Sequence, residues 1–276
     1  IRRCNSWADF VHEVSRLETT TDLGDAFERL TQLQMLTDPL YRAVYKNVWM
    51  AKQSDGEIPK KVREHLNLTT TDEGIDLIAE THHGTYASIQ VKYRTDGKRL
   101  NVRELSTFAN LSFRNCTNID DAIVRTNANP PQKKDLLRGV RYEKLDTYLR
   151  MDKENSEGWK RIHAFINGLN PPKLTPKQPR PYQQEAIDNA VNYFQNNQSR
   201  GRLIMPCATG KSLIAYWIHQ ALDVRTVLIA VPSLALVNQT VDDWTMQAAL
   251  DDIQLDFLGV CSDERFGVVK RDPDSF

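Results

Sequence analysis

The segment RLIMPCATGKSLIAYWI, residues 202–218, constrains the fold more than any other part of the chain. Its apolar start predicts a short strand over 202–205, its middle a loop, and its end a helix. Backbone N–H groups in such a loop, together with the N-terminus of the helix, form a binding site for an anion. We therefore expect a phosphate-binding loop on an α/β fold, and TVLIAV, residues 226–231, as the next buried strand.

Each polar position at the end of this loop has a predicted role. Gly210 lets the backbone approach a phosphate without a Cβ in the way. Lys211 can reach the β- and γ-phosphates of a nucleotide, and the Ser212 hydroxyl can bind Mg²⁺. Thr209 completes the predicted nucleotide-binding residues of the loop.

The loop departs from the pattern G-x-x-x-x-G-K-[ST] at two positions. Met205 stands at the first glycine, and Ala208 stands where related loops often carry glycine. The alternative is a chance GKS string in a surface loop. The predicted strand before it and helix after it favour the functional interpretation, with Ala208 affecting the efficiency of binding rather than its location.

Three segments in order carry a resemblance to a known family. RPYQQEAI (180–187), PCATGKS (206–212) and VPSLALVNQT (231–240) resemble the Q motif, motif I and motif Ia of superfamily 2 helicase-like ATPases. The resemblance implies that Gln183 reads the adenine of ATP, that ATP and Mg²⁺ are the cofactors, and that residues 232–240 lie near a nucleic-acid backbone.

A second group of polar residues lies in GIDLIAETHHGTYASIQVKYR, residues 74–94, which predicts a strand, a turn and a strand. Gln90 and Lys92 are two apart and share one face of the second strand. A three-residue turn would place Asp76 opposite Lys92, whereas a two- or four-residue turn would place it across from Val91, on the wrong face. The two histidines at the tip are interpreted as a polar turn, because no third ligand stands at metal-binding spacing.

These residue types suit metal-dependent hydrolysis of a phosphodiester. Asp76 and the Gln90 side chain, or the Val91 carbonyl, could hold Mg²⁺, which prefers oxygen ligands. Lys92 could orient the attacking water or offset charge in the transition state. The pattern is loose, and an amphipathic hairpin can carry such residues by chance.

The hairpin resembles the PD-(D/E)xK nuclease fold, in the Mrr-like branch where Gln replaces the second acid. The resemblance adds Glu28, within DLGDAFERL, as a carboxylate that points into the site from the first helix. A solvated helix face is the alternative interpretation of Glu28.

The pattern along the chain predicts three regions. We expect an α/β restriction-endonuclease-like domain with a mixed central sheet at 1–152, a Pro-rich linker at 153–178, and the front of a RecA-like parallel-sheet ATPase domain at 179–276. Residues 7–49 are predicted to be mainly helical. Four cysteines far apart in sequence fit a reducing cytoplasm, and no apolar run reaches the length of a membrane span.

The order of the two domains resembles the N-terminal part of Type ISP single-polypeptide restriction-modification enzymes. That resemblance implies double-stranded DNA as the substrate, ATP-driven translocation, and possible methyltransferase and target-recognition domains further along the parent chain. With 36 Lys+Arg against 36 Asp+Glu, net charge alone does not predict DNA binding.

Two alternatives stay open. One is a repair translocase or helicase whose N-terminal domain binds DNA without cutting, and the other is an interaction module. No apolar strand ending in Asp-Glu follows the phosphate loop, so we expect no appreciable ATPase activity from this chain alone.

Overall fold

The computed structural model describes residues 1–51, 57–68, 74–132, 137, 139–169, 175–197, 200–251, 253 and 255. By its internal contacts the chain divides into two compact units, residues 1–173 and residues 174–257. None of the helices in the described ranges is long and apolar enough to cross a membrane.

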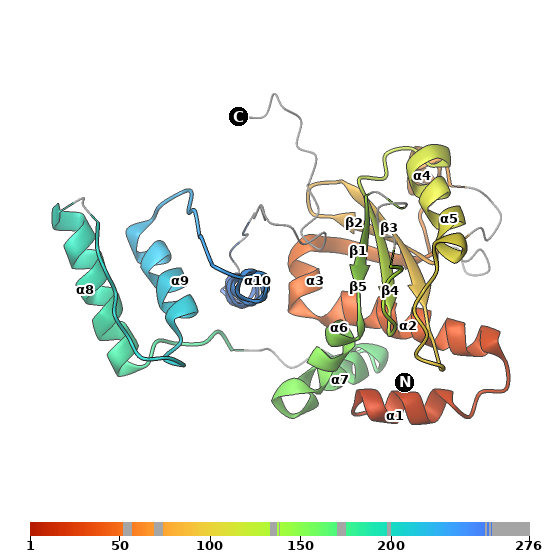
Figure 1. The fold of residues 1–276 in the computed structure, drawn as a ribbon, viewed down its shortest axis with the longest axis horizontal. Helices are drawn as coiled ribbons and strands as arrows, with labels where there is room; N and C mark the ends of the chain where they lie inside the picture. Colours follow the sequence, from red (N-terminus) through yellow and green to blue (C-terminus); the bar gives the residue numbers. More distant parts are fainter. Residues whose placement is uncertain are drawn as a thin grey trace. The chain divides into compact units, whose positions relative to one another are not determined.

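The first unit is built on a five-stranded mixed sheet, which confirms the predicted central sheet (Figure 1). Its strands lie in chain order: β1 (Tyr45–Met50), β2 (Leu77–Thr81), β3 (Tyr86–Lys92), β4 (Asp121–Thr126) and β5 (Val140–Glu143). β2 pairs antiparallel with both β1 and β3, whereas β3, β4 and β5 run parallel.

Helices pack on both faces of this sheet. In chain order they are α1 (Trp7–Val14), α2 (Thr20–Thr37), α3 (Pro39–Val44), α4 (Lys60–His65), α5 (Val102–Asn110), which continues as a π-helical turn (Leu111–Asn115), α6 (Leu145–Leu149), a 3₁₀ turn (Arg150–Asp152) and α7 (Lys153–Ile166). In Figure 1, α3 and α5 lie on opposite sides of the strands.

The alternation of side chains along the strands divides the interior into two hydrophobic cores. Ile89 and Val91 of β3 belong to a core with Phe27 of α2. Val124 of the neighbouring strand belongs to the other core, with Phe108 of α5. Because successive strand residues point to opposite faces, Gln90 and Lys92 share the α5 side of β3.

Two parts of the first unit differ from the sequence-based expectations. Tyr45–Met50, predicted to continue a helix, forms strand β1 because it pairs with β2 and buries Val48 in the core. The predicted linker at 153–178 begins instead with helix α7, whose Trp159 and Ile162 are fully buried. A helix with buried core residues belongs to the folded unit rather than to a linker.

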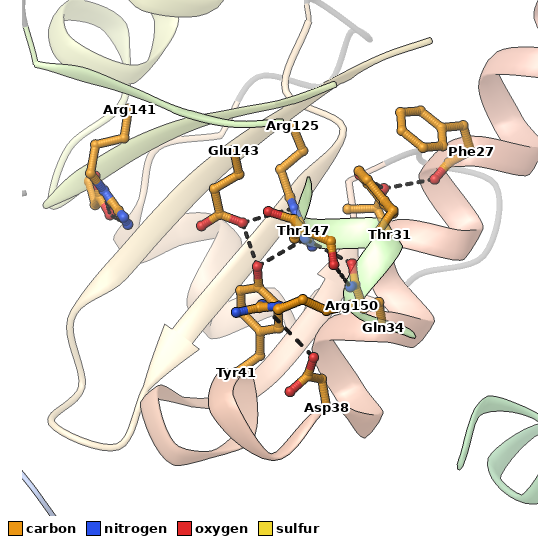
Figure 2. A network of polar contacts seen from close by, with 12 residues as sticks. Phe27, Thr31, Gln34, Asp38, Tyr41, Arg125, Arg141, Glu143, Thr147 and Arg150 are labelled. Carbon is orange, nitrogen blue, oxygen red and sulfur yellow. Dashed lines mark hydrogen bonds and ion pairs between the residues drawn. The ribbon is translucent and has the colours of Figure 1, made fainter. Parts of the chain in front are cut away.

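A buried polar network joins β4 and β5 to the helices on one side of the sheet (Figure 2). Arg125 of β4 is fully buried, and its guanidinium donates to the Gln34 side-chain oxygen at 2.8 Å and to the Tyr41 hydroxyl at 3.0 Å. Tyr41 donates in turn to Glu143 of β5 at 2.6 Å, and the guanidinium also lies 5.1 Å from the Tyr148 ring centroid. The network therefore fixes α2, α3 and α6 against the parallel strands.

The second unit contains α8 (Pro181–Asn197), α9 (Lys211–Leu222) and α10 (Leu234–Leu250). The helix predicted after the phosphate loop forms as α9. The predicted strands over 202–205 and 226–231 do not form among the described residues, and Ile204 and Leu228 are 82% and 95% exposed. An extended segment becomes a strand only when a neighbouring strand pairs with its backbone groups.

Candidate functional site

The β2–β3 hairpin has a three-residue turn, but its register differs from the prediction. The Thr81 N–H donates to the Thr85 carbonyl at 2.9 Å, so residues 82–84 form the turn. Leu77 pairs with Ile89 in the strand register. The backbone N–H of Asp76 donates to the carbonyl of Ile89 at 2.9 Å. Asp76 therefore lies beside Ile89–Val91 and not opposite Lys92, because the turn is centred one residue earlier than that pairing requires.

Asp76 and Gln90 are both buried at this end of the hairpin. A carboxylate oxygen of Asp76 accepts a hydrogen bond from the backbone N–H of Val91 at 2.6 Å, between Gln90 and Lys92. The Gln90 Oε1 atom is buried, with no hydrogen-bond partner among the described residues. Burying a polar atom without a hydrogen bond or a bound ligand costs free energy. The oxygen atoms of Asp76 and Gln90 therefore fit a divalent cation that prefers oxygen ligands.

A glycine that the sequence analysis did not single out lies next to Gln90. Gly74 has a φ of +103°, and a Cβ placed on it would lie 3.2 Å from Gln90 Nε2. The amide of Gln90 thus occupies space that a side chain at position 74 would take. The signal in the sequence was the glycine two residues before Asp76.

An aromatic contact brings the segment that carries Glu28 beside the segment that carries Lys92. The rings of Phe27 and Tyr93 lie 5.2 Å apart, and each residue adjoins one of the predicted site residues. Glu28 is 7% exposed, so it is a buried carboxylate of α2 rather than a solvated helix face. Lys92 ends β3 and is half-buried.

Other acids near the hairpin take part in structural contacts. Glu57 accepts hydrogen bonds from Gln32 Nε2 at 2.7 Å and from the Met50 N–H at 2.8 Å. Glu80 accepts from Asn47 Nδ2 at 2.7 Å. His82 lies in the turn, where its Nε2 is 2.9 Å from the Arg42 carbonyl, as expected for a polar turn. Among the described residues there is no group of three or more His, Cys, Asp or Glu side chains that could hold a metal ion.

The predicted phosphate loop precedes α9 in the second unit. Gly210 adopts the left-handed conformation (φ +77°), and α9 begins at Lys211 with no side-chain cap. Its first N–H groups are thus open to an anion. Lys211 Nζ donates to the carbonyls of Met205 and Pro206 at 3.2 and 2.9 Å. The Ser212 Oγ atom is buried, with no hydrogen-bond partner among the described residues.

Gln183 of α8 touches this loop instead of leaving its amide open. Its Oε1 accepts from the Arg180 N–H at 2.9 Å, and its Nε2 donates to the Thr209 carbonyl at 2.9 Å. A Cβ on Gly210 would lie 2.7 Å from Gln183 Nε2. In this structure both ends of the amide hold the loop, so reading an adenine would require that Gln183 exchange these partners.

Sequence reasoning missed one contact of the loop. Trp244 of α10 donates its indole N–H to the Ser212 carbonyl at 3.0 Å. No signal in the sequence pairs position 244 with the loop, because the two lie 32 residues apart.

Comparisons with known proteins agree with the two resemblances found in the sequence. Residues 36–151 match the family model described as "Restriction endonuclease", and residues 176–261 match the model described as "Type III restriction enzyme, res subunit". Among solved structures, the chain resembles an ATP-dependent Type ISP restriction-modification enzyme, LlaBIII, bound to DNA, with 22% identity and a TM-score of 0.61. The match covers 87% of this chain and 15% of that enzyme, and the likeness shows the fold. No protein of curated function matches the chain.

Proposed function

We propose that this chain is the nuclease and front motor portion of a restriction-modification enzyme that cuts double-stranded DNA and moves along it with ATP. Two restriction-type family matches in the same chain support this reading. The observation that carries the nuclease assignment is the buried pair Asp76 and Gln90, in which the Gln90 Oε1 atom has no hydrogen-bond partner in the described part of the chain. A methyltransferase and a target-recognition domain elsewhere on the parent chain belong to the same proposal, and the cytoplasmic location stays a prediction.

In the proposed nuclease site, Asp76 and Gln90 hold a divalent metal through their side-chain oxygens. When bound, the metal supplies a water of lowered pKa and draws charge from the scissile phosphate. The Val91 N–H fixes the orientation of the Asp76 carboxylate. Lys92, on the same face as Gln90, offsets negative charge on the phosphate, and Glu28 supplies a further carboxylate.

Plasmid nicking in the presence of Mg²⁺ tests the nuclease proposal. The variants Asp76→Asn and Lys92→Ala should each lose nicking by at least about 100-fold, the scale of one electrostatic catalytic group. Glu80→Gln is the matched control, because Glu80 lies on β2 beside Asn47 and outside the site. Nicking that persists in Asp76→Asn, or that is absent from the intact parent protein, contradicts the proposal.

The alternative of a DNA-binding domain without nuclease activity makes a different prediction. In that case the parent protein would bind and translocate DNA, yet neither the native chain nor Gln90→Glu, which restores the usual second acid, would nick it. Gln90→Glu is therefore informative, because the nuclease proposal expects retained or increased cutting in this variant.

In the proposed nucleotide site, the first N–H groups of α9 and Lys211 bind the phosphates, and Ser212 holds Mg²⁺. In this structure the Lys211 ammonium group donates hydrogen bonds to two carbonyls of the loop. On nucleotide binding, the phosphates would replace these carbonyls as its partners. Lys211→Ala should abolish binding of a fluorescent ATP analogue, whereas Lys160→Ala, on α7 beside Glu157, should leave it unchanged. Equal binding by both variants would refute the site.

Cys207 offers a second test of the same loop. It is exposed within the loop, whereas Cys4 and Cys116 are buried. In a Cys261→Ser background, an ATP analogue should protect Cys207 from alkylation if the phosphates bind here. The isolated chain is still expected to show no multiple-turnover ATP hydrolysis.

A further inference from the structure

Two partly buried hydrogen bonds join helix α9 to helix α10 and its C-cap. The indole N–H of Trp244 donates to the Ser212 carbonyl at 3.0 Å, in the first turn of α9. The hydroxyl of Tyr216 donates to Asp251, the C-cap of α10, at 3.1 Å. Only the first of these bonds reaches the phosphate loop.

The packing around Trp244 holds its ring in place. The residue is 5% exposed, and its ring lies 5.4 Å from the Tyr216 ring in an edge-on arrangement. The Trp244 ring also stacks on His219, with ring centroids 5.7 Å apart and an interplanar angle of 28°. A rigid donor in such a packed site fixes its acceptor, so the position of Ser212 depends on α10.

Two different groups of Ser212 matter for the link between helix α10 and the phosphate loop. Its carbonyl receives the Trp244 bond, while its buried Oγ has no hydrogen-bond partner among the described residues. A ligand that binds the Ser212 hydroxyl will therefore hold or shift the residue whose carbonyl is hydrogen-bonded to Trp244. On the other flank, Gln183 holds the Thr209 carbonyl, so the loop is anchored on both sides by different helices.

We propose that Trp244 is a positioning residue that couples Mg²⁺–nucleotide binding at Ser212 to helix α10. The inference rests on the proposed nucleotide site. Because coupling between two sites is reciprocal, a ligand that orders Ser212 also stabilises α10 in its present position, and nucleic acid held near residues 232–240 would change the affinity for nucleotide.

The variant Trp244→Phe tests this, since it keeps an aromatic ring and removes the donor. Isothermal titration of the full 276-residue chain with a non-hydrolysable ATP analogue should show about two- to ten-fold weaker binding with Mg²⁺, the range of one net hydrogen bond. The change should vanish in EDTA, because Ser212 then has no ion to hold. Tyr216→Phe is the matched control: it loses one hydrogen bond between the same helices and should bind like wild type.

The outcomes separate the inference from the proposed function. A wild-type chain that binds no nucleotide overturns the proposed site itself. Wild-type binding with equal affinities for Trp244→Phe and Tyr216→Phe, or an equal loss in EDTA, overturns the coupling alone. If Trp244→Phe does not fold, the indole ¹⁵N–H resonance of Trp244 in the unmodified chain decides: it should shift with the analogue plus Mg²⁺, and an unchanged resonance overturns the inference.

Discussion

The guanidinium of Arg125 lies 3.0 Å from the carboxylate of Glu143, and the arginine side chain is wholly buried. The two residues belong to the adjacent parallel strands β4 and β5, where Arg125 and Glu143 also pair directly in the register. On its other flank Arg125 pairs with Val91, whose N–H holds Asp76. The ion pair (Figure 2) thus ties β5 to β4, and β4 is the strand that pairs with β3 of the candidate nuclease site.

Removing one partner of this ion pair should destabilise the first unit strongly. Arg125→Met removes the nearest cation of the largely buried Glu143 and the hydrogen bonds of the guanidinium, and we expect a loss of about 3 kcal/mol in the free energy of unfolding. Amide hydrogen exchange along β4 and β5 measures this loss. The double variant Arg125→Met with Glu143→Gln should lose less than the sum of the two single variants, and strict additivity would contradict the pairing.

The stability of the first unit should depend on pH through Glu143. Burial alone would raise the pKa of this carboxyl, but the charge of Arg125, and then that of Arg141, holds the pKa below its usual value. A lowered folded-state pKa stabilises the protein above the pKa of the unfolded chain, and this contribution is lost as the pH falls through the folded-state pKa. Urea unfolding between pH 7 and pH 2 should therefore show a shallower acid limb in Glu143→Gln than in Glu157→Gln, a helix-surface control.

A methyl group on Gly210 should disturb the phosphate loop through Gln183. The added Cβ would lie 2.7 Å from Gln183 Nε2, and φ at this position is +77°. Gly210→Ala should weaken nucleotide binding and cost about 1–2 kcal/mol of local stability through the left-handed backbone alone. Adding Gln183→Ala relieves the clash but not the backbone strain. An equal loss of α9 protection in the single Gly210→Ala and the double variant would show that the contact is unimportant.

Replacing Ala208 with glycine should stabilise the phosphate loop. It holds a φ of +61°, a conformation that glycine adopts without a Cβ penalty. Ala208→Gly is expected to stabilise the loop by about 1 kcal/mol, read as slower amide exchange at the start of α9. Asp223→Gly at φ +50° is the comparison, and it should gain less because Asp tolerates this region better than Ala. Faster exchange in Ala208→Gly would contradict the strain argument.

Local patterns predicted helix α9 and the two strands of the β2–β3 hairpin, but not the register of the hairpin. Alternation in residues 86–92 predicted β3 with Gln90 and Lys92 on one face, and the GKS string predicted the loop before α9. These features depend on side-chain periodicity and on glycine's backbone freedom, which neighbouring residues carry. The two restriction-type resemblances were likewise readable from short motifs, and the family matches agree with them.

Tertiary structure decided what depends on partners distant in sequence. Tyr45–Met50 became a strand because β2 lies beside it, and the hairpin register depends on which residues occupy the turn. The buried state of Arg125 depends on acceptors from α2, α3 and β5, and the link between Ser212 and Trp244 spans two helices. Hydrogen bonds and packing between separate elements have no local signature, because each partner alone is an ordinary residue of its own helix or strand.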